Sequence, residues 1–298
     1  YVDSLTNRSH SRSNGHDLNV EVNDSDNTWM FNASLGVTPQ SRTIDRKVGK
    51  LYADTAMNMI DFQPMIWMSW RKKEMRVSLN YNGNTRQPSL SDLMPLTDNS
   101  NPLYITRGNP DLKQMFSHNI RLNFQNSPKG ISANLGGQVE QNSVTQVMIY
   151  DVQTGGRETY PVNINGNWNL FGGASWWKRF GHFSLRLDMS GNHSNRVGMI
   201  NEDKSLQPEK STTRDTGLNC EAQASYQPSW GGIDLSTSWN YQYSLNSLND
   251  NDTYTRYYNF GLNGYVDFPF GLQLRTDATY NLRSGTNIQK GEDDEILW

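Results

Sequence analysis

The chain of 298 residues contains a single cysteine, Cys220, so it cannot form a disulfide within itself. No apolar run approaches the roughly 18 residues of a membrane-spanning helix, so this chain could cross a bilayer only with strands. Hydrophobic residues make up 35% of the sequence and the mean hydropathy is -0.77, which is too polar for an ordinary large soluble core. The net charge of -3 comes without any cluster of lysine and arginine, so we expect no nucleic-acid partner.

Aromatic residues, in contrast, are abundant. Phe, Trp and Tyr account for 11% of the residues, and nine residues are Trp. Disordered chains are poor in aromatic residues, so the low hydropathy does not indicate disorder here. A barrel of strands with a polar interior would reconcile the polar composition with the many aromatic side chains.

The segment 233–245 alternates between two kinds of residue along its whole length. Side chains of a strand point to opposite faces at successive residues, so this pattern predicts a long strand with one apolar face and one polar face. Its length exceeds that of a typical strand in a soluble protein. The apolar or aromatic members are Ile233, Leu235, Trp239, Tyr241, Tyr243 and Leu245.

The same alternation returns in segments along the whole chain. Such repeated segments, separated by turns, predict an all-β, antiparallel transmembrane β-barrel whose apolar residues face lipid and whose polar residues face a wet lumen. Cys220 falls on an apolar row, where a small hydrophobic side chain is expected. The further segments are 75–82, 116–124, 183–190, 218–226 and 272–283.

Short and long connections alternate between these segments. Outer-membrane barrels have short periplasmic turns and long extracellular loops, and counting strands on either side of the short turns gives about twelve. Short turns are expected near 23–27, 71–73, 127–130, 178–181, 228–232 and 268–271. Long polar loops are expected at 40–56, 84–114, 145–158, 196–213, 245–253 and 285–292.

The polar rows carry charges of both signs. Because these rows should face the lumen, their charged residues are the candidates for function inside a pore. The candidates are Arg76, Arg121, Arg186, Asp188, Glu221, Asp234, Arg275 and Asp277. The five histidines show no metal-ligand spacing, and no phosphate loop or nucleophile elbow appears, so we expect no enzyme, no metal and no cofactor.

A proline- and glycine-punctuated stretch between residues 86 and 113 carries a resemblance to a known family. The stretch resembles a motif of TonB-dependent receptor barrels in the outer-membrane β-barrel family. The family motif commonly ends in Pro and Glu, where this chain has Gln114 and Met115. The matching residues are Arg86, Pro88, Ser89, Asp92, Leu93, Pro95, Asn101, Pro102, Gly108, Asn109, Pro110, Leu112 and Lys113.

The resemblance implies more than the pattern does. Receptors of this kind have about 22 strands around an N-terminal plug domain, and a TonB box couples them to an energy complex. Residues 1–298 would then be the C-terminal barrel portion, without the plug and the last strands. Implied partners are outer-membrane lipid, the plug, the TonB complex through the absent N-terminal part, and an unknown solute. For the charged residues of the lumen, contact with the plug is expected ahead of a role in selecting the solute.

The function expected from this resemblance is uptake of a large or scarce solute, such as an oligosaccharide, a peptide or a metal chelate, across the outer membrane of a Gram-negative cell. A passive channel, or a structural or adhesive barrel, is a second hypothesis, and a soluble all-β binding module is a third. Segment 84–114 would cap the barrel mouth and fix strand register, or contact the ligand directly.

Overall fold

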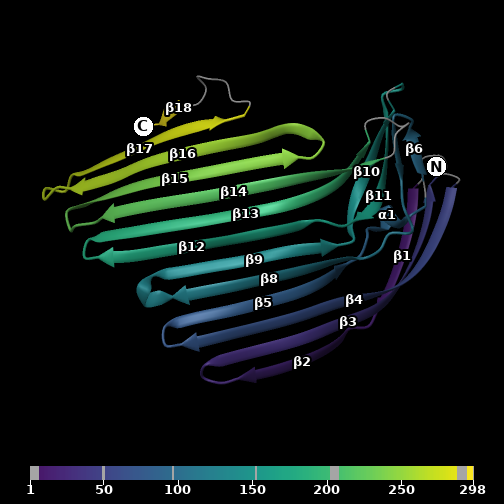
Figure 1. Ribbon diagram of the computed structural model, residues 1–298, viewed down its shortest axis with the longest axis horizontal. Helices are drawn as coiled ribbons and strands as arrows, with labels where there is room; N and C mark the ends of the chain where they lie inside the picture. Colours follow the sequence, from purple (N-terminus) through teal and green to yellow (C-terminus); the bar gives the residue numbers. More distant parts are fainter. Residues whose placement is uncertain are drawn as a thin grey trace.

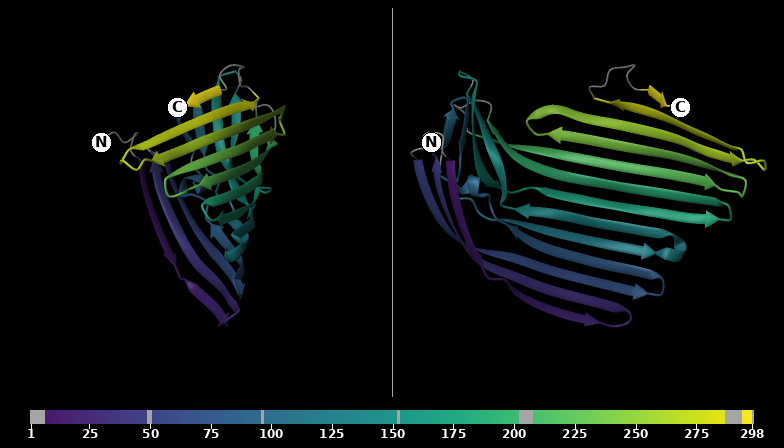
Figure 2. Two further views of the ribbon diagram at one scale, coloured as in Figure 1. Left: turned by 90° about the vertical axis from the view of Figure 1, so that its left-hand side faces the viewer. Right: turned by 180° about the vertical axis from the view of Figure 1, so that it is seen from behind.

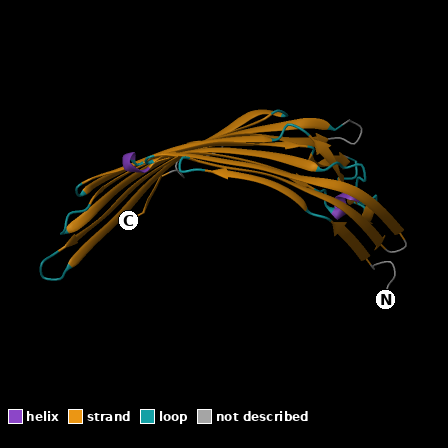
Figure 3. Ribbon diagram, turned by 90° about the horizontal axis from the view of Figure 1, so that it is seen from below, coloured by secondary structure: helices purple, strands orange, loops and turns teal. Residues whose placement is uncertain are grey.

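A computed structural model of the chain describes residues 7–48, 51–95, 97–151, 153–201, 208–286 and 294–297. These residues form one broad sheet of long strands, with two short helical segments, α1 (Leu90–Leu93) and η2 (Ser127–Lys129) (Figure 1). Viewed from below, the sheet is an arch (Figure 3). No strand pairing joins its two edges within the described residues, so the number of strands in a closed barrel stays a prediction.

The main strands follow one another in chain order across the sheet, and each is antiparallel to its neighbours. They are β2 (Leu18–Ser25), β3 (Trp29–Val48), β4 (Leu51–Lys72), β5 (Met75–Arg86), β8 (Met115–Asn126), β9 (Ile131–Gln141), β12 (Trp168–Phe180), β13 (Phe183–Asn201), β14 (Glu209–Tyr226), β15 (Gly231–Asn246), β16 (Asn249–Asp267) and β17 (Gln273–Gly285). At the edges, β1 (Asn7–Gly15) pairs with the later part of β3, and β18 (Asp294–Leu297) pairs with β17.

Each site that was expected to hold a short turn holds one, and all six turns lie at the same end of the antiparallel strands (Figure 1). In the first turn, the Asp26 carboxylate accepts the N–H groups of Trp29 and Thr28, both at 2.6 Å, and these bonds lower the pKa of Asp26. In the third, Gly130 has a φ of 65° and lies so close to the Trp177 carbonyl that a Cβ would sit 1.7 Å from its oxygen. Only glycine fits there.

The long loops expected at the other end are mostly strand. Residues 40–56 continue the β3–β4 hairpin on both sides of the undescribed residues 49 and 50, and residues 245–253 continue β15 and β16. Residues 145–158 form much of a hairpin of β10 (Ser143–Asp151) and β11 (Gly156–Ile164). Apolar alternation stops where both faces of a strand can be polar, whereas backbone hydrogen bonding continues. Residues 202–207 and 287–292 lie outside the described residues.

The register places the two kinds of side chain on two separate faces of the whole sheet. Leu235 of β15 lies level with Ala224 of β14 and Leu262 of β16, and the same row continues to Leu185 of β13 and Ala278 of β17. We call this surface the apolar face and the other the polar face. Further members of the apolar face are Val20, Leu35, Leu79, Leu122, Leu135 and Leu187.

The apolar face is exposed. Leu235 is 51% accessible and Leu135 is 62% accessible, although a soluble protein would bury such residues. A contiguous apolar surface of this extent requires an apolar surrounding. Within the described residues, neither helical segment has the length or the apolar character to span a membrane.

A smaller structure rises from the end of the sheet opposite the short turns (Figure 2). It contains α1, β6 (Thr97–Asn101), β7 (Tyr104–Arg107), β10 and β11. β7 runs parallel to β11, and β10 runs parallel to the last residues of β13. We call the described residues of 87–114 and 142–164 the cap. Its core is buried and consists of Leu93, Met94, Leu112, Val147, Pro161 and Ile164.

Candidate functional site

The first part of the family-like motif folds as a capped turn of helix that is fixed to the neighbouring hairpin. The Ser89 hydroxyl accepts the Asp92 N–H at 3.2 Å and donates to the Asp92 carboxylate at 2.5 Å, which is the N-cap arrangement expected of serine. Asp92 also accepts a hydrogen bond from Gln146 of β10 at 3.2 Å. The next residue, Leu93, is 0% accessible. These motif residues therefore join α1 to the core of the cap.

The second part of the motif turns beneath this helix. The Asn109 N–H donates to the Asp92 carbonyl at 2.5 Å, and its side-chain amide donates to the Pro161 carbonyl at 3.0 Å. The Asn109 side-chain oxygen accepts the Asp111 N–H at 3.0 Å, which forms an Asx-turn. One asparagine thus ties the motif to α1 and to β11.

The glycine before Asn109 lies against the end of α1. A Cβ at Gly108 would sit 1.9 Å from the Met94 carbonyl oxygen and 3.0 Å from the Asp92 carbonyl oxygen. No real Cβ approaches an oxygen so closely, so this backbone contact requires glycine. Met94 and Leu112 on either side of the contact are 2% and 6% accessible.

The remaining motif residues end strands or form turns. Arg86 is the last residue of β5, and the prolines Pro88, Pro95, Pro102 and Pro110 all lie outside strands, where a missing N–H costs nothing. Asn101 accepts the Leu103 N–H at 3.0 Å in the turn from β6 to β7, and Lys113 leads toward β8. These residues shape the turns of the cap, and a role in covering a barrel mouth stays a prediction.

Both ends of the motif segment meet one carboxylate on the wall. Asp61 of β4 accepts side-chain hydrogen bonds from Gln87, and from Gln114 at 3.5 Å. Gln40 of β3 donates to the same carboxylate at 2.6 Å. Gln114, where the sequence departs from the family pattern, is therefore one of the tethers. Sequence patterns gave no sign of Asp61.

Asn163 of β11 is a second residue that the sequence did not single out. Its side-chain oxygen accepts the Lys113 N–H at 2.6 Å, and its amide donates to the Lys113 carbonyl at 3.0 Å and the Asn142 carbonyl at 2.8 Å. Asparagine is common throughout this chain, so nothing in its spacing marks this one residue. It closes the motif segment against the hairpin.

Asn163→Ala should loosen the exit of the motif segment. The substitution leaves three backbone groups without their partner, at a cost of about 1 kcal/mol because water can reach the site. Limited proteolysis of the full-length protein should then cut within 87–114 earlier than in wild type. Asn163→Asp, which cannot donate to the two carbonyls, should behave no better than alanine; wild-type resistance in both variants would contradict the assignment.

The eight charged residues expected in the lumen all lie on the polar face. Arg76 lies on β5, Arg121 on β8, Arg186 and Asp188 on β13, Glu221 on β14, Asp234 on β15, and Arg275 and Asp277 on β17. The guanidinium of Arg186 pairs with Asp188 at 2.6 Å.

Arg121 makes a different contact on the same face. Its guanidinium lies 5.1 Å from the centre of the Phe171 ring. The ring also covers Gly136, where a Cβ would be 2.5 Å from a ring carbon. Gly136 of β9 lies between Arg121 of β8 and Phe171 of β12, and its lack of a side chain lets the ring reach the guanidinium.

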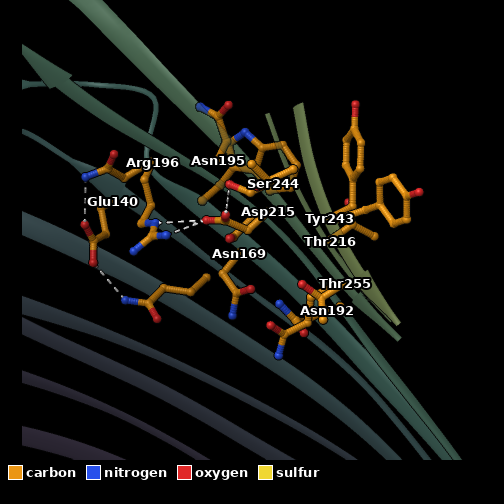
Figure 4. A pocket seen from close by; sticks show the side chains of 18 residues that line it. Glu140, Asn169, Asn192, Asn195, Arg196, Asp215, Thr216, Tyr243, Ser244 and Thr255 are labelled. Atoms are coloured by element: carbon orange, nitrogen blue, oxygen red, sulfur yellow. Dashed lines mark hydrogen bonds and ion pairs between the residues drawn. The ribbon is translucent and has the colours of Figure 1, made fainter. Parts of the chain in front are cut away.

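A polar hollow of about 670 Å³ opens where the outer ends of β9 and β12–β16 meet the foot of the cap (Figure 4). Such a volume lies in the range of small-ligand sites. Its three charged residues are Glu140, Arg196 and Asp215, and most of its other lining residues carry amides or hydroxyls. None of the eight lumen candidates lines it, although they lie on the same polar face.

Two of the three charged residues in the hollow form an ion pair. Arg196 donates to Asp215 at 2.5 Å, and Ser244 donates to the same carboxylate at 2.7 Å. Glu140 accepts the Gln138 amide at 3.0 Å and the Ser143 hydroxyl at 2.8 Å. The donors to Glu140 are neutral, so the lining carries a net negative charge.

No metal centre is present among the residues that the structure describes: no group of three or more His, Cys, Asp or Glu side chains converges. The one cysteine, Cys220, is half-buried on the apolar face, level with Met189 and Trp239.

Comparison with known proteins agrees with the architecture. A family model described as the outer membrane protein beta-barrel family matches residues 31–298, which is nearly the whole described sheet and all of the cap. Searches of curated proteins and of solved structures give no match to this chain. Long antiparallel strands with one exposed apolar face and one polar face are what a barrel wall in a membrane requires. The chain therefore belongs to the outer membrane protein β-barrel family.

Proposed function

We propose that this chain is the barrel portion of a TonB-dependent receptor of the Gram-negative outer membrane that takes up a large or scarce solute. An oligosaccharide, a peptide and a metal chelate are the solute classes considered. The observation that carries the proposal is the cap, because the family-like motif folds into a compact structure with its own core at the end of the wall opposite the short turns. The proposed role is binding and passage, without catalysis.

The polar face supports a partner inside the barrel. Glu221, Asp234 and Asp277 have no ion-pair partner among the described residues, although all three stand on a wall rich in polar side chains. A plug domain in the full-length protein would supply donors for these carboxylates. The TonB complex would act through the same N-terminal part. These partners belong to the proposal.

The alternative is a passive channel, or a structural or adhesive barrel. A wall with mixed charges on its polar face would also suit a water-filled pore. The two functions differ in their need for energy, because a receptor coupled to TonB depends on the proton gradient of the inner membrane and a passive pore does not.

Uptake by cells that produce the full-length protein tests the proposal. Solutes of the three classes are supplied one at a time as a limiting nutrient, and growth is compared with and without a functional TonB protein. We expect growth on at least one solute to be lost without TonB, and its accumulation to stop when a protonophore is added. Growth that persists without TonB, together with steady conductance of the purified protein in planar bilayers, would favour the passive channel.

A further inference from the structure

The polar hollow lies at the outer ends of the wall strands, beside the foot of the cap. It is lined by the outer ends of β9, β13, β14, β15 and β16 and by the start of β12 (Figure 4). The cap lies beside it, because Ser143 at the foot of the cap donates a hydrogen bond of 2.8 Å to the lining residue Glu140. Asn167 links these parts, because its side-chain oxygen accepts the Val197 N–H at 2.8 Å and its amide reaches Glu140 at 3.4 Å. The hollow is therefore held by hydrogen bonds on several sides.

Several amides in the hollow have no hydrogen-bond partner among the residues that the structure describes. The side chains of Asn169, Asn192 and Gln242 all lie on the polar face, and none forms a hydrogen bond with another described residue. Each carries two donors and an acceptor with two lone pairs. Asn192 has room because it lies over Gly217, where a Cβ would be 2.5 Å from its side-chain oxygen. These amides are available to a ligand.

Hydroxyl groups extend this surface, and apolar side chains are nearly absent from it. Ser194, Thr253 and Thr255 lie on the same face as the free amides. The aromatic residues that border the hollow belong by register to the opposite face; they are Trp168, Tyr243 and Tyr254. The lining has no aliphatic side chain, so it offers little to a lipid or to an apolar peptide side chain.

From this lining we infer that the hollow binds a neutral oligosaccharide. Free amides and hydroxyls both donate and accept hydrogen bonds, and sugar hydroxyls do the same. Each hydroxyl of the ligand can therefore find a donor or an acceptor in the lining. Arg196 is paired with Asp215, and Glu140, whose donors are neutral, leaves the lining with a net negative charge that disfavours an acidic glycan or an anionic chelate. The inference rests on the proposed function and selects one of its three solute classes.

Binding by the full-length protein, purified in detergent, tests this site without any energy source. The probes are neutral gluco-, manno-, xylo- and fructo-oligosaccharides, compared with uronic-acid oligosaccharides of the same lengths and with short peptides. Isothermal titration should detect at least one neutral oligosaccharide and much weaker binding of the acidic ones. In the double variant Asn169→Ala/Gln242→Ala, affinity for that oligosaccharide should fall by tenfold or more, because two amides that contact it are lost.

The matched control is Asn123→Ala/Asn134→Ala. These two asparagines face each other on β8 and β9 of the same polar face, outside the hollow, so affinity should stay at the wild-type value. Heat-modifiable migration on a gel shows that both variants are folded. Binding to no neutral oligosaccharide, preferential binding of the acidic or peptide probes, or equal affinity in both variants would overturn the inference. None of these binding results decides whether uptake depends on TonB, because the growth experiment tests that separately.

Discussion

Leu235→Arg should destabilise the folded protein in a bilayer by roughly 2–4 kcal/mol, the cost measured for arginine near the midplane on the lipid face of a barrel. Leu235 stands on the apolar face between Ala224 and Leu262, and half of its surface is accessible. A guanidinium there would have to leave water for the hydrocarbon region. Unfolding of the full-length protein by guanidinium in lipid vesicles measures the loss. Leu185→Arg, in the same row two strands away on β13, should cost a similar amount.

The neighbouring residue supplies the control, because a strand reverses its face at each step. Ser236 points to the polar face, beside Gln223 of β14, and Ser236→Arg should leave stability within about 0.5 kcal/mol of wild type, as expected of a substitution that water can reach. Equal losses at Leu235 and Ser236 would mean that neither face meets lipid. A large loss at Ser236 alone would reverse the two faces.

The two-faced strands could be predicted from the sequence because the bilayer constrains every second residue. Ile233, Leu235 and Trp239 each need an apolar side chain for the same reason, so the signal adds up along a strand. The short turns were also predictable in position, since glycine, proline and charge gather there. The register across strands then follows from matching apolar rows.

The outer ends of the strands could not be predicted in this way. Beyond the bilayer both faces of a strand can be polar. The polar sequence of residues 40–56 therefore predicts a loop, where β3 and β4 in fact continue. Their pairing depends on backbone hydrogen bonds, which every residue can make and which leave no mark in composition. The cap was recognised as a motif, but its core depends on Val147 and Pro161, more than 30 residues further along the chain.

The candidate site divides in the same way. Charged residues such as Arg186 and Asp277 stood out on the polar rows, and the structure places them on the polar face. Asn169, Asn192 and Gln242 did not stand out, because amides are frequent in this sequence and these three differ from the others only in lacking a hydrogen-bond partner among the described residues. Absence of a partner is a property of the fold and cannot be read from spacing.

Gly108→Ala should open the cap while leaving the wall intact. The new Cβ would meet the Met94 carbonyl oxygen at 1.9 Å, and relieving that overlap requires the turn and the end of α1 to separate. Overpacking of this kind costs about 1–3 kcal/mol. Separation would also break the hydrogen bond from the Asn109 N–H to the Asp92 carbonyl. Limited proteolysis of the full-length protein in outer membranes should therefore cut rapidly within residues 87–114.

Gly198→Ala is the matched control for this substitution. Gly198 lies on β13, next to the residues of this strand that pair with β10 of the cap, and a Cβ there would meet no atom within 4 Å. Gly198→Ala should resist protease as wild type does. Circular dichroism should show an unchanged strand content in Gly198→Ala and in Gly108→Ala. If Gly108→Ala were equally resistant, the close approach of residue 108 to α1 would not hold the cap together. If strand content fell as well, the cap would be needed to keep the wall itself folded, because β10 pairs directly with β13.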